Sequence, residues 1–230
     1  MNYELMDNNK VFLTGVVSSN PVFSHEIFGE GFYNLDLKVE RLSGSFDIIP
    51  ITVSERLLTE ENFKFNNKVS IKGQFRSYNK SENGKSHLVL TVFVREITEV
   101  DNTLNPNIIE LTGFVCKAPI YRTTPFKREI CDVLLAVNRA YNKSDYLPCI
   151  AWGRNARFIK NMEIGKKVTI IGRIQSREYQ KKLGEEALTK TAYEISISKI
   201  RLDNIEENKT DIVDNFEEDN LDKTNNNLIV

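Results

Sequence analysis

The sequence predicts an all-β protein in which one small domain is present twice, ahead of an acidic tail. The duplication is indicated by short landmarks that return at an almost constant spacing. Leu13-Thr14-Gly15 returns as Leu111-Thr112-Gly113, which is a spacing of 98 residues. The other landmarks return after 98 or 99 residues: Pro21 as Pro119, Arg41 as Arg139, Pro50 as Pro148, Lys68-Val69 as Lys167-Val168, and Gly73 as Gly172.

Apolar runs of strand length predict the elements of each copy. In the second copy they cover residues 109–115, 130–138, 147–152, 167–176 and 191–202, with a short helix expected within 153–162. In the first copy they cover residues 10–17, 32–40, 48–53, 68–77 and 88–100, with a helical piece expected at 55–61. Gly172, inside a long strand, predicts a sharp bend or a close backbone approach.

Three strands, a short helix and two further strands are the order of the five-stranded oligonucleotide-binding (OB) barrel. The sequence therefore predicts an all-β fold with short helices, made of two tandem OB-fold five-stranded barrels. Polar arms at 79–85 and 175–188 are expected to extend from the long strands.

Charge divides the chain into three parts. Residues 1–101 carry 11 Lys and Arg against 14 Asp and Glu, residues 102–204 carry 18 against 10, and residues 205–230 carry 2 against 8. We expect one domain at 1–101, a second at 107–204, and a disordered acidic tail at 205–230, where apolar residues are too sparse for a core. A basic domain between acidic neighbours indicates a polyanion partner. Charges scattered over solvated faces are an equally open interpretation.

The sequence lacks the residues that several classes of protein require. No apolar run approaches the ~20 residues of a membrane span, and no signal-peptide pattern is present, so we expect a cytoplasmic protein with no membrane partner. The three cysteines have no C-x-x-C spacing, and both histidines lie in the other copy, so neither a metal site nor a cofactor is predicted. We find no Ser/His/Asp set, no Gly-rich phosphate loop and no plausible carboxylate pair. The protein is predicted not to be an enzyme.

Segments of the second copy carry a resemblance to a known family. They are Leu111-Thr112-Gly113 with Ala118-Pro119, Leu135-Ala136-Val137-Asn138-Arg139, Cys149-Ile150-Ala151-Trp152-Gly153-Arg154, and Gly172-Arg173-Ile174-Gln175-Ser176-Arg177. In this order the second copy resembles the bacterial single-stranded DNA-binding proteins (SSB), and the first copy resembles them only by way of the second. The resemblance implies non-catalytic, sequence-tolerant binding of single-stranded DNA in replication, recombination or repair. It also implies a bacterial protein that is nucleoid-associated or encoded by a mobile element.

Four family aromatics that stack on bases fall on aromatic residues of this sequence: Tyr141, Tyr146, Trp152 and Tyr179. The chemistry agrees, because a ring that covers a base contributes about 1–3 kcal/mol whatever the base, and cations bind phosphates with release of counterions. The cations that interleave with these rings are Arg139, Arg154, Arg157, Arg173, Arg177, Lys181 and Lys182. A core position is an equally open interpretation of Trp152, which ends an apolar strand. Arg139 recurs as Arg41, which leaves a structural role open for it.

The first copy lacks these rings. The matching positions hold Ser43, Ile48, Ser54 and Lys80, so we expect a degenerate OB domain that serves assembly or partner binding and has little DNA affinity. The resemblance implies a homodimer, since two chains give the four OB folds common in the family. It also implies recruitment of replication proteins by the tail, although the tip Leu228-Ile229-Val230 lacks the usual Pro-Phe ending.

Two other functions stay open at this point. An OB fold can serve as a protein-interaction module, here in the assembly of a replication or mobile-element complex. Stacking on unpaired bases also suits single-stranded RNA, so the sequence does not separate an RNA binder from a DNA binder.

Overall fold

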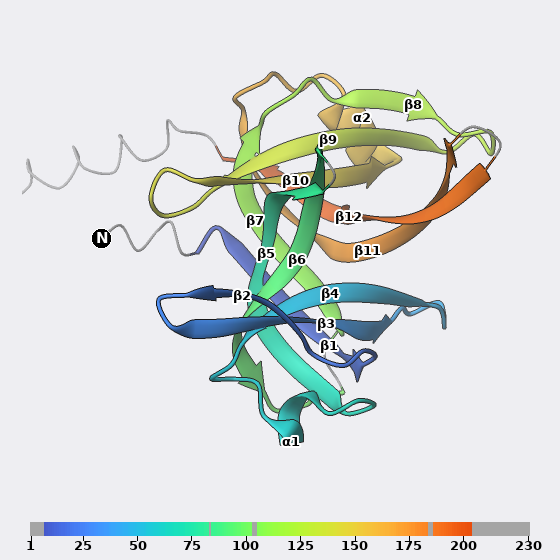
Figure 1. Ribbon diagram of the computed structural model, residues 1–230. Helices are drawn as coiled ribbons and strands as arrows, with labels where there is room; N and C mark the ends of the chain where they lie inside the picture. Colours follow the sequence, from blue (N-terminus) through green and yellow to red (C-terminus); the bar gives the residue numbers. More distant parts are fainter. Residues whose placement is uncertain (1–6, 83, 103–104, 184–185, 204–230) are drawn as a thin grey trace, which may run out of the picture.

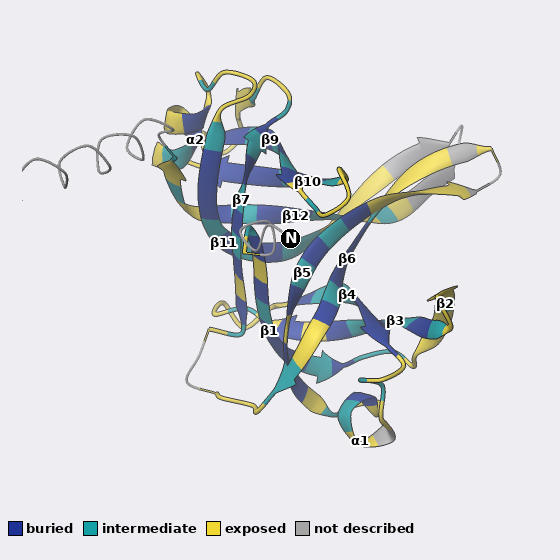
Figure 2. Ribbon diagram, turned by 90° about the vertical axis from the view of Figure 1, so that its left-hand side faces the viewer, coloured by how far each residue is buried: buried dark blue, intermediate teal, exposed yellow. Residues whose placement is uncertain are grey.

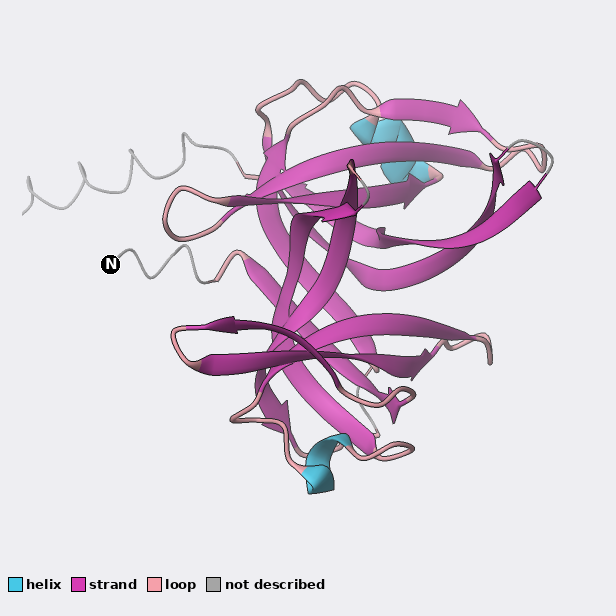
Figure 3. Ribbon diagram, in the orientation of Figure 1, coloured by secondary structure: helices cyan, strands magenta, loops and turns pink. Residues whose placement is uncertain are grey.

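The structure is a computed structural model that describes residues 7–82, 84–102, 105–183 and 186–203. Within these ranges the chain is mostly β-strand, with two short helices at opposite ends of the molecule (Figure 3). The predicted all-β fold with short helices is therefore confirmed. The acidic tail predicted at 205–230 lies outside the described residues.

Each copy of the repeat forms a unit of six strands and one helix. The first unit contains β1 (Asn9–Val17), β2 (Val22–Ile27), β3 (Glu30–Glu40), β4 (Phe46–Ser54), α1 (Glu60–Phe63), β5 (Lys68–Glu82) and β6 (Lys85–Thr98). The second unit contains β7 (Asn107–Val115), β8 (Ile120–Thr123), β9 (Glu129–Asn138), β10 (Ser144–Trp152), α2 (Arg154–Ile159), β11 (Lys167–Leu183) and β12 (Glu186–Leu202) (Figure 1).

Strand pairing closes each unit into a five-stranded barrel. In the first unit β1 pairs with β3 and β5, β3 with β4, and β5 with β6, all antiparallel, and the parallel pair of β4 and β6 completes the circuit. In the second unit β7, β9, β10, β12 and β11 repeat these five pairings. Successive side chains on a strand point to opposite faces, so each barrel has an inner core face and an outer face.

Two strands and one helix boundary differ from the sequence-based expectation. β2 and β8 are unexpected, because they lie at the two ends of the sheet and nearly all of their residues are exposed, which leaves no apolar alternation to detect. Helix α1 spans four residues at 60–63 rather than 55–61. Its start is fixed by the Thr59 hydroxyl, which accepts from the Asn62 N–H at 3.2 Å, and turns that begin at Ser54 occupy the preceding residues.

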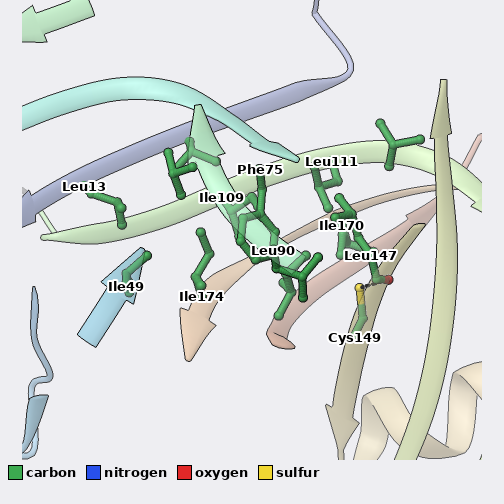
Figure 4. Close-up of a cluster of buried hydrophobic side chains, with 14 of the residues drawn as sticks. Leu13, Ile49, Phe75, Leu90, Ile109, Leu111, Leu147, Cys149, Ile170 and Ile174 are labelled. Atoms are coloured by element: carbon green, nitrogen blue, oxygen red, sulfur yellow. Dashed lines mark hydrogen bonds between the residues drawn. The ribbon is translucent and has the colours of Figure 1, made fainter. Parts of the chain in front are cut away.

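The two barrels join edge to edge through β1 and β7. These strands pair antiparallel from Asn9 opposite Leu111 to Leu13 opposite Asn107, so the twelve strands make one continuous sheet. The hydrophobic core is also continuous across this seam. Side chains from both units share one buried cluster, among them Leu13, Ile49, Phe75, Leu90, Ile109, Leu111, Leu147 and Ile170 (Figure 4).

Two long hairpins contact the opposite barrel. The β5–β6 hairpin leaves the first unit and runs along the second (Figure 1), where the Ser77 N–H donates to Asp145 Oδ1 at 2.7 Å. In return, the Ser176 N–H of the β11–β12 hairpin donates to Asp47 Oδ1 at 2.7 Å. Figure 2 shows buried strands in the barrels and exposed surface towards the ends of the hairpins. Because these serines and aspartates are repeat equivalents, the junction has approximate two-fold symmetry.

Two buried asparagines shape the seam where β1 and β7 leave their own barrels. The Asn9 amide donates to the Phe75 carbonyl at 2.7 Å and accepts from the Phe75 N–H at 2.9 Å. Asn107 makes the same pair of bonds with Ile174, at 2.7 and 2.9 Å. Each side chain thus replaces a missing strand partner, which satisfies backbone groups that would be costly to bury unpaired.

Gly172 and its repeat equivalent Gly73 lie at irregularities of the long strands, as the sequence predicts. A Cβ on Gly172 would lie 2.3 Å from the Ser196 carbonyl oxygen, and one on Gly73 would lie 2.4 Å from that of Phe93. Because a backbone atom cannot rotate away, we expect Gly172→Ala to destabilise the fold by about 1–3 kcal/mol, the usual cost of overpacking.

The expected loss in Gly172→Ala is read as a lower urea midpoint by circular dichroism. Lys199→Ala is the control, because Lys199 is an exposed residue of β12, and it should leave the midpoint nearly unchanged. An unchanged midpoint in Gly172→Ala would show that the backbone approach is not tight.

Candidate nucleic-acid interface

The outer face of β10 carries two of the predicted rings. Leu147, Cys149 and Ala151 are in the core, so the alternation of the strand turns Tyr146 and Trp152 outward. Their exposed fractions are 49% and 40%. The structure therefore places Trp152 on the surface rather than in the core.

Tyr179 lies on the same outer face, on the arm of β11. Ile174 is in the core, so the alternate residues Arg173, Arg177 and Tyr179 point outward. Register links this row to β10 through β12, since Ser196 is opposite Arg173 on one side and beside Ile150 on the other. The structure thus turns Tyr146, Trp152 and Tyr179 outward on β10 and β11 of the second barrel.

Tyr141 occupies the turn between β9 and β10, where its ring is 91% exposed. Its φ is 60° and that of Asn142 is 55°, a left-handed conformation that costs a non-glycine residue roughly 1–2 kcal/mol. In the first unit the position equivalent to Asn142 is Gly44, with φ 82°. A large apolar ring held in the solvent by a strained turn is a candidate contact for a flat ligand.

The predicted cations fall into two groups. Arg154 and Arg157 lie on α2, next to Trp152; Arg157 pairs with Glu129 at 3.4 Å, and Arg154 is exposed and makes no ion pair with a described residue. Arg177 lies on the outer face and pairs with Glu194 at 3.8 Å. The side chains of Lys181 and Lys182 lie outside the described residues. Arg139 and Arg173 belong to a different place, the junction between the units.

At the junction these two arginines hold buried carboxylates. Arg139 pairs with Asp145 at 3.4 Å, and Arg173 of the β11 arm pairs with Asp47 of the first unit at 3.5 Å. Arg41 also binds Asp47 through both of its oxygens, with a 2.7 Å bond from Nε to Oδ2. The recurrence of Arg41 as Arg139 thus has a structural cause, because each anchors the aspartate that receives the opposite hairpin.

The two aspartates differ in electrostatic state although both are fully buried. Burial by itself would raise the pKa of Asp47, but hydrogen bonds from Arg41 and Ser176 outweigh it and hold that pKa below its usual value. Burial raises the pKa of Asp145 above its usual value, and the contacts with Ser77 and Arg139 offset this only in part. Asp145 Oδ2 is buried without a hydrogen-bond partner among the described residues.

Other surface rings and cations were missed by the sequence reasoning. In the second unit they are Tyr121 and Phe126 around β8, and Tyr121 has Lys160 above its ring at 5.3 Å. In the first unit they are Phe93, with Arg76 and Arg95 over its ring. A usable signal existed for the first pair, since Phe23 and Phe28 occupy the equivalent positions 98 residues earlier.

The described part of the chain contains no group of three or more His, Cys, Asp or Glu side chains placed to hold a metal ion. Within the same residues, neither helix has the length or apolar character of a membrane span.

Cysteine reactivity should follow burial. Cys131 and Cys149 are buried and Cys116 is half-buried, and burial raises the pKa of all three thiols. We expect a thiol reagent at pH 8 to modify Cys116 first and the other two only in denaturant, because the thiolate is the reactive form. Mass spectrometry of the labelled peptides reads the order. Early labelling of Cys149 would contradict the packing of β10.

Comparison with known proteins identifies relatives of the second unit. Residues 106–203 match the family model described as the single-strand binding protein family. The single-stranded DNA-binding protein of Clostridium tetani is 29% identical over 126 residues, which are 52% of this chain and 87% of that protein. Single-stranded DNA-binding protein 1 of Staphylococcus aureus is 33% identical over 85 residues, and the match spans 34% of this chain and about half, 51%, of that protein.

A solved structure resembles both units together. A deletion mutant of the single-stranded DNA binding protein from Thermus aquaticus aligns with a TM-score of 0.64 and 17% identity, over 85% of this chain and 94% of that one. At this identity the match establishes the fold alone, which is the tandem OB arrangement. Residues 106–203 thus form a domain of the single-strand binding protein family.

Proposed function

We propose that this protein binds single-stranded DNA without catalysis and with little regard to base sequence, mainly through the second barrel. The observation that carries the proposal is the outer face on which Tyr146, Trp152 and Tyr179 are exposed, with Arg177 on the same row of β11. Rings supply flat surfaces for unpaired bases, and guanidinium groups bind the phosphates between them. Every base has such a flat face, so the mode of binding tolerates any sequence.

The surface chemistry also explains why an unpaired strand fits better than a duplex. In a duplex the base faces are stacked on one another, and rings on a barrel wall cannot reach them. An unpaired strand exposes a face at each nucleotide, and about 4–16 nucleotides cover one OB fold. The match of residues 106–203 to the single-strand binding family supports this choice of ligand.

The test is a titration of a fluorescein-labelled oligo-dT by anisotropy over a range of salt concentrations. Tight binding at low salt is expected, with log K falling linearly with log salt at a slope of roughly −0.7 per phosphate contacted. A duplex of equal length is the control and should bind much more weakly. Equal affinity for the duplex would overturn the proposal.

A competition experiment tests whether the protein prefers single-stranded DNA or single-stranded RNA. We propose DNA as the ligand, so an unlabelled single-stranded DNA should displace the probe at a lower concentration than an RNA of equal length and sequence. Stronger displacement by the RNA would assign the same face to RNA.

Assembly and partner binding are further parts of the proposal. We infer that two chains associate, which would place four OB barrels in one particle, and that the tail at 205–230 recruits replication proteins. Light scattering after gel filtration should give twice the chain mass, and removal of the tail should leave DNA affinity intact while partner binding is lost. A chain that runs as a monomer at micromolar concentration would contradict the first inference.

A further inference from the structure

A cavity of about 240 Å³ opens at the junction of the two units, where the outer face of β5 and β6 meets the β9–β10 turn. Its lining is strongly cationic. Arg76 and Arg95 come from the first unit, and Arg139 and Lys143 come from the second; the acid in the lining is the buried Asp145.

The first-unit arginines are held in place by packing. Their Cζ atoms lie 5.2 and 5.1 Å from the centroid of the Phe93 ring, and Gln74 Oε1 accepts a hydrogen bond from each. Such cation–π contacts fix a guanidinium without neutralising it. Arg76 Nε is buried and has no hydrogen-bond partner among the described residues.

The charges in this cavity are not balanced. Burial, followed by the neighbouring charge of Arg139, lowers the pKa of Arg76 to about 10, with a further contribution from Arg95. Arg76 therefore stays charged at neutral pH. Asp145 opposes the arginines of the lining alone, and its own pKa is raised. A bound anion would relieve this repulsion.

The equivalent place on the other side of the two-fold junction lacks this excess. Repeat register puts Gln175 in the place of Arg76, Ser198 in the place of Arg95, and Ser45 in the place of Lys143. There Arg41 and Arg173 are both paired with Asp47. The two places have the same backbone scaffold. If the extra cations served only to stabilise that scaffold, they would be expected in both places.

We propose that this cavity holds a backbone phosphate of the single strand bound on the second barrel, so that the first unit supplies Arg76 and Arg95 to a composite site. The inference rests on the proposed function. Tyr141 lies on the wall of the cavity, so a strand that stacks on this ring passes its opening. Planar guanidinium groups match the oxygens of a phosphate. The first unit as a whole has a net negative charge, so its overall charge does not reveal this local cluster of arginines.

The experiment compares a short and a long oligo-dT, of about 8 and about 35 nucleotides, so that the short one covers a single OB fold. At ~0.1 M salt, Arg95→Gln should weaken the long oligonucleotide about fivefold and reduce the salt slope by about 0.7, as expected for one lost phosphate contact. Arg76→Gln should act similarly, and the short oligonucleotide should bind both variants as it binds the wild type.

The matched control is Arg56→Gln, which removes one charge from an exposed arginine of the same unit that pairs with Glu30 at 3.1 Å. It should leave both affinities unchanged. Arg95 is exposed, so its variant keeps the test valid if Arg76→Gln fails to fold. Wild-type affinity of Arg95→Gln for the long strand, an equal loss with Arg56→Gln, or an equal loss for the short strand would each overturn the composite site. Failure of the wild type to bind either length would instead refute the proposed function.

Discussion

Replacing Asp47 by Asn is expected to destabilise the folded chain by about 3–5 kcal/mol, the usual cost of breaking a buried ion pair from one side. Asp47 is fully buried and receives Arg41, Arg173 and the Ser176 N–H at the junction. An amide cannot accept from all of these donors, so the two arginines are left without their counter-charge. The measurement is urea unfolding at pH 7, followed by circular dichroism.

Asp145→Asn is the matched control, because it makes the same change at the equivalent position. Asp145 has a single, longer contact with Arg139 and an unpartnered oxygen, and its raised pKa means that folding disfavours its ionised form. We expect a clearly smaller loss than in Asp47→Asn. Equal losses in the two variants would contradict the different electrostatic states of the two aspartates.

The direction in which folding shifts the pKa of Asp47 determines how the stability loss in Asp47→Asn depends on pH. The pKa of Asp47 is lower in the folded chain than the usual value of about 3.9. Its ionised form therefore contributes full stability above about pH 4, and this contribution is lost as the pH falls through the folded pKa. The stability difference between the wild type and Asp47→Asn should narrow in acid. A difference that stays constant below pH 4 would contradict this assignment.

Loss of the outward rings is the second large effect. Trp152→Ala and Tyr179→Ala should each weaken oligo-dT binding by about 1–3 kcal/mol, because each removes one stacking surface. Both rings are on the surface, so unfolding midpoints should stay close to that of the wild type. Anisotropy titration at fixed salt measures the loss. The salt slope should be unchanged, since no phosphate contact is removed.

Phe28→Ala is the control for these variants. Phe28 is an exposed ring of the first unit, in the turn between β2 and β3, and it is not part of the outer face of β10 and β11. Its removal should leave DNA affinity unchanged. Equal losses in Phe28→Ala and Trp152→Ala would mean that any exposed ring contributes and that the face has no special role.

The sequence was sufficient for the fold because the repeat doubles every signal. A strand boundary that is ambiguous in one copy is supported by its equivalent in the other, and Gly73 and Gly172 mark the same close approach twice. The sequence did not predict β2 and β8, because an exposed edge strand has no buried face and therefore no alternating apolar pattern. The predicted rings could be placed on the surface only by the structure, since an aromatic at the end of an apolar strand can face either way.

The junction shows what the sequence could not provide. Arg139 is predicted as a DNA contact, and the structure adds a role that its position in the sequence does not reveal. Its partner Asp145 lies six residues away across a turn and binds a serine of the other unit. Arg76 and Arg95 belong to a unit with a net negative charge, so no count of charges singles them out. Their importance depends on which strands the duplicated fold places against each other, and that is a tertiary fact.

The fluorescence of Trp152 tests the central claim most directly, because it is the only tryptophan in the chain and lies on the proposed stacking face. On addition of oligo-dT at low salt, its emission should be quenched and should saturate, and the quenching should be reversed by salt. Emission that is unaffected while the labelled strand is bound would place the DNA elsewhere on the molecule.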